Sequence, residues 1–375
     1  MLIFIFIISV LVFILLVVLF LWLTGRRTHV GATPLLTRLA ENPVLEPIAS
    51  HWWESEAVFN PAAVVEGGRV HLFYRALGRD GVSRIGYASS ADGIHFDQRL
   101  PSPVYAAESI EEAKQHHPYT SPARLTYDTI NNPSGGGWGG CEDPRAVKID
   151  DRVYITFNMF NGWSSMRVAF TSIDAQNLTR AQWLWSKFNY LSRPGERHKN
   201  WVLFPEKING KFALFHNLHD EDVGKVRVAY MDNLSVDEAP FQHESPDPQQ
   251  LPDRVVGWHH RTRSAGSPPI KTDKGWILLY HAMDKDDQHR YKVGALLLDL
   301  NDPTKVLYRS QKPVLAPDAW YENDWKPGII YASGGVIFGD DLLVYYGGGD
   351  KRIAAAKINL KEFLQKLTSP ENKVY

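Results

Sequence analysis

The stretch that decides the fold is residues 203–219, which read "LFPEKINGKFALFHNLH". Asn209-Gly210 stands between two short runs in which apolar and polar residues alternate, and Asn-Gly is a strong signal for a two-residue hairpin turn. The second run ends in aromatic residues followed by polar ones. This stretch therefore predicts two antiparallel strands whose second member ends in a polar loop.

The same plan recurs four more times along the chain. The copies are "NPAAVVEGGRVHLFYRALG" at 60–78, "EDPRAVKIDDRVYITFNMF" at 142–160, "SPPIKTDKGWILLYHAMD" at 267–284 and "SGGVIFGDDLLVYYGGGD" at 333–350. Each is followed by a further apolar run that reads as another strand. Five recurrences at intervals of roughly 60 to 80 residues are typical of propeller blades, whereas a β-sandwich does not predict such recurrence. The fold predicted is all-β, a five-bladed β-propeller preceded by one N-terminal transmembrane helix.

The first 25 residues differ from the rest of the chain. Leu2 to Leu23 carry no charge, and such a run is long enough to cross a hydrocarbon layer of about 30 Å at about 1.5 Å per residue. No basic residues precede the run and no small-residue cleavage site follows it, as a secretory signal would require. The prediction is a membrane protein with a single-pass anchor. Arg26 and Arg27 after the span favour a cytoplasmic catalytic domain.

The predicted domain organisation follows from these patterns. It comprises a transmembrane anchor at 1–25, a linker at 26–51, a catalytic propeller at 52–362 and a C-terminal tail at 363–375. Within the propeller, residues 106–138 are predicted to be an insertion that ends in the Gly-rich "NNPSGGGWGG".

Composition excludes several classes of function. The formal net charge is -1 and no basic run of five or more residues occurs, so the charge pattern does not predict nucleic-acid binding. The single cysteine excludes an internal disulfide framework and a thiolate metal site. The 14 histidines show no spacing that suits a metal. The sequence therefore predicts neither a metal nor another cofactor.

A propeller brings the starts of its inner strands together around one axial pocket. The segments that lead the predicted blades carry Asn60, Asp143, Lys199 and Ser267. These side chains are expected to converge at one place.

Six motifs in order resemble those of glycoside hydrolase family 130, the β-mannoside phosphorylases and their relatives. They are "FNPA" with "YRA" at 59–62 and 74–76, "SRIGYASSADGIHF" at 83–96, "GCEDPR" at 140–145, "KNWVLFPEKINGK" at 199–211, "PPIKTDKGWILLYH" at 268–281 and "VYYGGGD" at 344–350. The likeness runs from about Trp52 to Leu360. The fold that the resemblance implies is a five-bladed β-propeller.

The resemblance implies a function as an inverting β-mannoside phosphorylase. Such an enzyme transfers a mannosyl group between a β-mannoside, linked β-1,2 or β-1,4, and inorganic phosphate to give α-mannose 1-phosphate. An ordinary inverting glycosidase needs a second carboxylate to activate water. Phosphate is already an anionic nucleophile, so a cationic cradle can replace that base. The expected partners are a β-mannoside oligosaccharide and phosphate, together with a membrane.

Asp143 matches the family's proton donor in the Glu-Asp-Pro-Arg motif. A donor must be protonated at the working pH, so burial or the neighbouring Glu142 charge is expected to raise its pKa. The alternative is an Asp-Pro turn with Arg145 as its ion-pair partner. Glu142 and Arg145 are expected to shape the substrate site.

The resemblance also implies a set of phosphate contacts. They are Asn60, Arg75, Lys199, Tyr280 and His281. Guanidinium forks and ammonium groups suit phosphate oxygens. Surface cations and core aromatics are the alternative interpretation of these positions.

Three more residues are candidates for contacts with sugar hydroxyls: Asp92, His216 and Asp350. Asp92 and Asp350 are equally consistent with turn positions. The sequence departs from the family at Asn217, where many phosphorylases have arginine, and at Ser267, where proline is common. Both departures weaken the phosphate assignment more than the mannoside assignment.

Three other functions fit parts of the pattern. A β-mannoside hydrolase would use the same pocket, with Glu142 or another acid activating water. A β-mannosyltransferase would use a phosphate-activated donor. A non-catalytic carbohydrate-binding propeller would have no need of the proton donor Asp143.

Overall fold

The computed structural model describes residues 34–107, 134–161, 166–217, 226–238, 258–259, 261–284 and 289–374. Leu35–Tyr375 form one compact unit. Its described part is built almost entirely from β-strands, which confirms the predicted all-β class. The helices among these residues are short: α3 (Ala175–Thr179), α4 (Leu360–Leu367), and the 3-10 turns η3 (Trp320–Glu322) and η4 (Pro370–Asn372).

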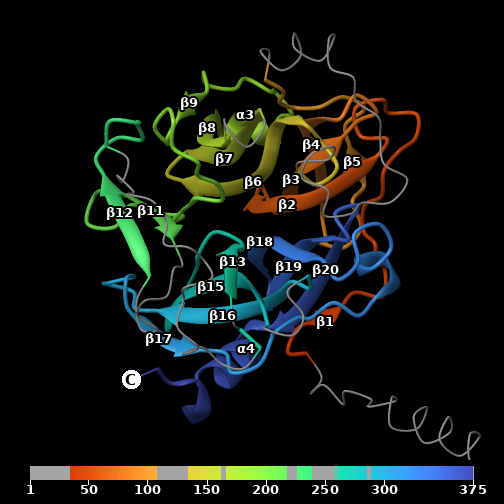
Figure 1. Ribbon diagram of the computed structural model, residues 1–375. Helices are drawn as coiled ribbons and strands as arrows, with labels where there is room; N and C mark the ends of the chain where they lie inside the picture. Colours follow the sequence, from red (N-terminus) through yellow and green to blue (C-terminus); the bar gives the residue numbers. More distant parts are fainter. Residues whose placement is uncertain are drawn as a thin grey trace, which may run out of the picture. The chain divides into compact units, whose positions relative to one another are not determined.

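The strands form five successive antiparallel groups in four hydrogen-bonded sheets, because a short parallel pairing of β4 with β6 joins the first two groups into one sheet (Figure 1). The first group is β2 (Ala57–Glu66), β3 (Arg69–Leu77), β4 (Val82–Ser90) and β5 (Gln98–Arg99). The second group is β6 (Gly139–Ile149), β7 (Arg152–Asn161), β8 (Met166–Asp174) and β9 (Asn189–Tyr190). The third is β10 (Val202–Leu203), β11 (Phe212–Asn217) and β12 (Arg227–Met231). The fourth is β13 (Arg261–Ala265), β14 (Ile270–Thr272), β15 (Gly275–Met283), β16 (Lys292–Leu298) and β17 (Val306–Arg309). The fifth is β18 (Ile330–Phe338), β19 (Asp341–Gly348), β20 (Arg352–Asn359) and β1 (Thr37–Arg38).

The groups are arranged around a common centre, as in a β-propeller. The leading strands β2, β6 and β18 contact one another, and β10 contacts β6. The leading strand is the first strand of each group. The start of β2 pairs with the end of its antiparallel neighbour β3, and the start of β6 pairs with the end of β7. Residues at the start of one and at the end of the other therefore meet.

The turns that the sequence predicts are present. Asn209 and Gly210 both have positive φ, 53° and 78°, between β10 and β11, as a primed hairpin turn requires. Gly67 and Gly68 make the corresponding turn between β2 and β3, with φ of 54° and 74°. The local turn chemistry thus sets where each hairpin folds back.

The first described strand completes the last group. β1 pairs antiparallel with β20, with Thr37 opposite Lys357 and Arg38 opposite Ala356. The Arg38 guanidinium donates to both carboxylate oxygens of Glu322, at 2.8 and 2.9 Å. Residues 35–51 of the predicted linker therefore belong to the β-domain.

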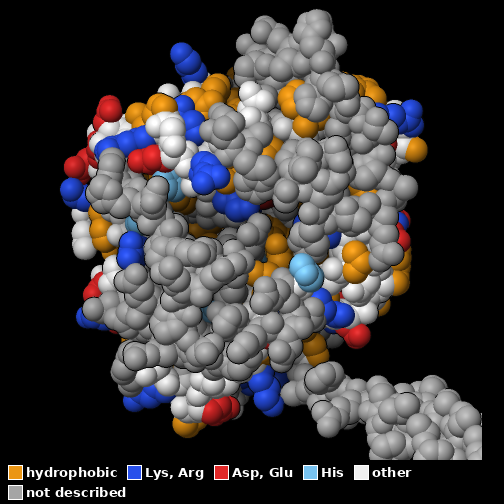
Figure 2. All heavy atoms as spheres, viewed as in Figure 1, with side chains coloured by type: hydrophobic (Ala, Val, Ile, Leu, Met, Phe, Trp, Pro, Cys, Tyr) orange, Lys and Arg blue, Asp and Glu red, His pale blue; other side chains and the backbone are white. Residues whose placement is uncertain are grey.

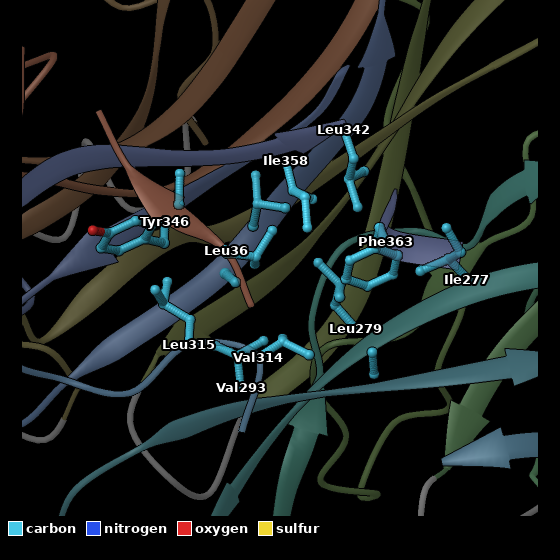
Figure 3. Close-up of a cluster of buried hydrophobic side chains, with 14 of the residues drawn as sticks. Leu36, Ile277, Leu279, Val293, Val314, Leu315, Leu342, Tyr346, Ile358 and Phe363 are labelled. Carbon is cyan, nitrogen blue, oxygen red and sulfur yellow. The ribbon is translucent and has the colours of Figure 1, made fainter. Parts of the chain in front are cut away.

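Apolar side chains fill the spaces between neighbouring groups. The largest cluster joins the fourth and fifth groups (Figure 3). Helix α4 adds Phe363, Leu364 and Leu367 to it, and Leu36 enters it from the start of the domain. Each buried aliphatic or aromatic side chain of this kind stabilises the fold by about 1.5–3 kcal/mol.

The predicted membrane location is wrong. In the part of the chain that the structure describes, from residue 34 onward, no helix is long and apolar enough to cross a bilayer. The longest is α4, with 8 residues, whereas a span needs about 20. The expected anchor, residues 1–25, lies outside the described residues.

Candidate active site

Two leading strands carry the same irregularity at their starts. The β2–β3 register breaks between Phe59 and Ala62, and the β6–β7 register breaks between Glu142 and Arg145. Inside these bulges Asn60 has φ of 49° and Asp143 has φ of 50°. Such backbone is uncommon for residues other than glycine and costs on the order of 1–3 kcal/mol. The bulges turn two polar side chains out of their strands and toward each other.

Asp143 accepts hydrogen bonds from two neighbours through the same oxygen. Asn60 Nδ2 donates to Asp143 Oδ1 at 2.7 Å, and Arg75 Nη1 donates to it at 3.3 Å. The Asp143 side chain is 13% exposed. Because both donors are on Oδ1, a proton on this acid belongs on Oδ2. The predicted juxtaposition of Asn60, Arg75 and Asp143 is present.

Arg75 is buried and forms ion pairs with both adjacent acids, Glu142 and Asp143. Its Nε donates to Ser83 Oγ at 2.9 Å, and its Nη2 donates to Glu142 Oε1 and to the Ser134 carbonyl oxygen, each at 2.8 Å. Its guanidinium lies 4.7 Å from the centre of the Phe59 ring. The contacts that this arginine makes are therefore mostly with carboxylates and neighbouring oxygens.

The pKa values of the two acids move in opposite directions. Burial raises the pKa of Glu142 to about 7, and the adjacent Asp143 adds to this effect against the opposing charge of Arg75. Burial also disfavours the charged form of Asp143. The Arg75 charge and the Asn60 hydrogen bond nevertheless outweigh burial and hold the Asp143 pKa below its usual value. The expected rise in the Asp143 pKa is thus wrong, and Glu142 is the acid whose pKa is raised.

Arg145 lies on the other side of Asp143 and is also buried. Its Nη1 donates to the Asp143 carbonyl oxygen at 3.0 Å and its Nε donates to the Gly266 carbonyl oxygen at 2.6 Å. Its Nη2 donates to the Tyr331 hydroxyl at 3.1 Å. Arg145 therefore adds positive charge beside Asp143 without forming the ion pair expected of a simple Asp-Pro turn.

His281 takes part in a hydrogen-bonded chain that ends at Arg145. The Ala332 backbone N–H donates to His281 Nε2 at 2.8 Å, so in the neutral ring the proton is on Nδ1, 3.2 Å from Ser264 Oγ. Ser264 Oγ lies 3.0 Å from the Tyr331 hydroxyl, and the His281 and Tyr331 rings stack at 4.2 Å. The structure thus places His281 behind Arg145, with Tyr331 between them.

Two predicted site residues lie elsewhere. Tyr280 is buried in the hydrophobic cluster of the fourth group, and its hydroxyl lies 3.1 Å from His259 Nδ1. Because strand residues alternate in direction, Tyr280 and His281 face opposite sides of β15. Asp92 lies beyond the far end of β4, where Oδ1 accepts from the backbone N–H groups of Ile94 and His95, each at 2.8 Å. Its carboxylate closes a turn.

Two of the remaining candidates, Lys199 and Asp350, act electrostatically on the cluster. Lys199 is half-buried, and its positive charge favours the ionised forms of both Glu142 and Asp143. Asp350 is buried, forms an ion pair with Lys326 at 2.7 Å and acts electrostatically on Arg75.

His216 packs edge-on against Trp201, with ring centres 6.1 Å apart. Burial, assisted by Arg227, lowers the pKa of His216 to about 4, so its ring is neutral near pH 7.

Three residues of this cluster were missed from the sequence: Ser134, Ser264 and Tyr331. Ser134 lies in the Gly-rich end of the predicted insertion, where composition signals only a loop. Ser264 in β13 and Tyr331 in β18 lie just before Ser267 and Ser333, where the fourth and fifth copies of the repeat begin, so the repeat pointed to their neighbourhood but not to these two side chains.

The cluster combines a carboxylic acid, Asp143, with several fixed cations. In the described residues, no group of three or more His, Cys, Asp or Glu side chains is arranged to hold a metal ion. Figure 2 shows one face of the molecule, hollowed near its middle, with Lys and Arg side chains beside the hollow. An acid held among cations can protonate a leaving group while an anion binds next to it.

Comparison with known proteins agrees with this chemistry. Residues 126–369 match the family model Glyco_hydro_130, described as β-1,4-mannooligosaccharide phosphorylase. A 1,2-β-oligomannan phosphorylase of Thermoanaerobacter sp. (strain X514) is 34% identical over 335 residues, covering 87% of this chain and 98% of the relative. A β-1,2-mannobiose phosphorylase of the same strain is 34% identical over 340 residues, covering 86% and 97%.

A solved structure from work on GH130 hydrolases that target β-1,2-mannosidic linkages in Candida mannan has the same fold. Its TM-score is 0.65 at 25% identity, and the match covers 88% of this chain and 95% of that one. The match with the family model spans more than half of the chain. The protein therefore belongs to glycoside hydrolase family 130.

Proposed function

We propose that this protein is a β-mannoside phosphorylase, an enzyme that transfers a mannosyl group to inorganic phosphate. The proposal rests on one observation above all: Asp143 is bound through Oδ1 by Asn60 and Arg75. Positive charges surround this acid. The relatives described above are named as phosphorylases of β-1,2-linked mannosides. In finer detail, we propose an inverting reaction on a β-1,2- or β-1,4-mannoside that gives α-mannose 1-phosphate, on a five-bladed propeller in which each strand group is one blade.

Asp143 is the proposed proton donor, and Oδ2 is the oxygen that carries the proton. The surrounding cations favour its ionised form. A phosphate anion bound among Lys199, Arg145 and Arg75 would cancel much of that positive charge and raise the Asp143 pKa. Binding of phosphate would therefore prepare the acid for protonation of the leaving sugar oxygen, and no second carboxylate would be required.

Asn60 is bound to the proposed proton donor, and its amide oxygen is enclosed by the fold. Its amide nitrogen donates to Asp143, which leaves Oδ1 as an acceptor, and this buried oxygen has no hydrogen-bond donor within the described residues. A β-carbon at Gly347 would lie 2.4 Å from the same oxygen, so only glycine permits this approach. We propose that Asn60 acts through its amide nitrogen, by holding Asp143 Oδ1.

A hydrolase is the second candidate, because the solved structure of the same fold comes from work on GH130 hydrolases. In this chain, Glu142 is poorly placed to activate water. It is almost fully buried, and its two oxygens bind Arg75 and Ser134 at 2.8 and 2.7 Å.

One assay separates the two functions. The purified full chain is incubated with β-1,2-mannobiose or β-1,4-mannobiose, with and without inorganic phosphate. Formation of mannose 1-phosphate only when phosphate is present supports the phosphorylase. Release of mannose at the same rate in both conditions would identify a hydrolase.

A further inference from the structure

Ser134 lies at the described end of the predicted insertion and contacts both Arg75 and Glu142. Its Oγ donates to Glu142 Oε2 at 2.7 Å, and its carbonyl oxygen accepts from Arg75 Nη2 at 2.8 Å. Arg75 Nη2 also donates to Glu142 Oε1 at 2.8 Å. These three hydrogen bonds connect Ser134, Arg75 and Glu142 to one another in pairs.

The backbone of this segment is held from both sides. Ser134 and Gly137 exchange backbone hydrogen bonds at 3.2 and 2.8 Å. Trp138 donates from its backbone to the Gly81 carbonyl oxygen at 3.0 Å and from Nε1 to the Asp80 carbonyl oxygen at 2.7 Å. The position of Ser134 is therefore set by the turn and by Trp138, independently of Glu142.

The same segment covers Arg75 directly. Gly135 has φ of 50°, and a β-carbon there would lie 3.2 Å from Arg75 Nη1 and 3.1 Å from the Phe59 ring. The guanidinium is thus enclosed between Phe59 and residues 134–135. It has little freedom to reach further into the site than Asp143 Oδ1.

We propose that Ser134 and Glu142 are positioning residues: together they fix the Arg75 guanidinium so that Nη1 stays on Asp143 Oδ1, and the proton of the catalytic acid is confined to Oδ2. This inference rests on the proposed phosphorylase function and assigns Glu142 a role other than substrate contact or water activation. It also connects the end of the insertion to the acid.

The charged and titratable groups that face Glu142 are consistent with this role. Arg75 on β3 contacts it directly, Asp143 follows it on β6, and Lys199 acts on it from the segment before β10. Loss of the Ser134 hydroxyl removes a donor to the carboxylate. Such a loss raises the Glu142 pKa and weakens its hold on Arg75.

The test compares Ser134→Ala, the conservative Ser134→Thr and the matched control Ser310→Ala. Ser310 is a buried serine whose Oγ accepts from the Ala295 backbone N–H at 3.0 Å in the fourth group. In Ser134→Ala we expect kcat for phosphorolysis to fall by about tenfold, as for loss of one hydrogen bond to a charged group. We expect KM for the mannoside to stay unchanged and the pH profile of kcat to move. Ser134→Thr restores both, and Ser310→Ala changes neither.

A crystal structure of Ser134→Ala provides a readout that does not depend on activity. The expected result is that Arg75 Nη1 moves away from Asp143 Oδ1. An unmoved guanidinium, or a rise in KM with unchanged kcat, overturns the positioning role. If the wild type forms no mannose 1-phosphate, the proposed function fails, but the crystal structure still decides the positioning role. If Ser134→Ala does not fold, Glu142→Gln serves in the same comparison.

Discussion

The raised pKa of Glu142 predicts how the stability of the protein depends on pH, and this can be measured without a substrate. Glu142 has a pKa of about 7 in the folded protein, against 4.5 when unperturbed. Between these values the folded state holds a proton that the unfolded state has released, so the free energy of unfolding decreases as pH rises. At about 1.36 kcal/mol per pH unit, the full loss between pH 4.5 and pH 8 is about 3 kcal/mol. The contribution is complete below pH 4.5 and absent above pH 7.

The variant Glu142→Gln isolates this contribution, because glutamine has nearly the same shape and does not titrate. The free energy of unfolding is measured by urea denaturation, followed by tryptophan fluorescence, for wild type and variant from pH 4.5 to pH 8. Their difference is expected to shift by about 3 kcal/mol in favour of the variant as pH rises, since the other titrating groups cancel. Glu41→Gln, at an exposed position, serves as the control. A difference that stays constant over this range would refute the buried, destabilised carboxylate.

Three further variants test the acid and its neighbours. Asp143→Asn is expected to lower mannose 1-phosphate formation by about 10²–10⁴-fold, the usual contribution of a general acid, with an unchanged circular dichroism spectrum; retention of more than a tenth of the activity would remove Asp143 from this role. Asn60→Ala loses the donor to Asp143 Oδ1, so the Asp143 pKa rises and the limb of the pH–rate profile that reports this acid moves to higher pH, whereas an unmoved limb would exclude the contact. Arg145→Lys keeps the charge but loses the planar fork that reaches Tyr331, and steady-state kinetics are expected to show kcat lowered by about tenfold; wild-type kinetics would mean that charge alone suffices.

The sequence predicted the all-β class and the core of the site because both depend on short-range signals. Asn209-Gly210 and Gly67-Gly68 set hairpins through their backbone preferences alone. The repeat then placed Asn60 and Asp143 at equivalent positions, so their meeting followed from the geometry of the strand groups.

Other features could not be predicted, because they depend on long-range contacts. The direction of the Asp143 pKa shift is a balance between burial and charges from several strands, and the motif contains only one of these charges. Tyr280 and His281 are adjacent in sequence, but strand alternation sends them to opposite faces. Whether Tyr280 or His281 points toward the site depends on β18, which lies much further along the chain. Ser134 in its Gly-rich loop gave no signal at all.

The pairing of β1 with β20 has a consequence for how the domain comes apart. An open array of repeats can fray from either end, because its terminal units have only one neighbour. Here the outermost strand of the last group comes from the other end of the domain, and Arg38 on that strand is bound to the fully buried Glu322. The first and last strands of the domain must therefore separate before the ring of groups can open. Loss of structure should therefore proceed as one concerted event across all five groups.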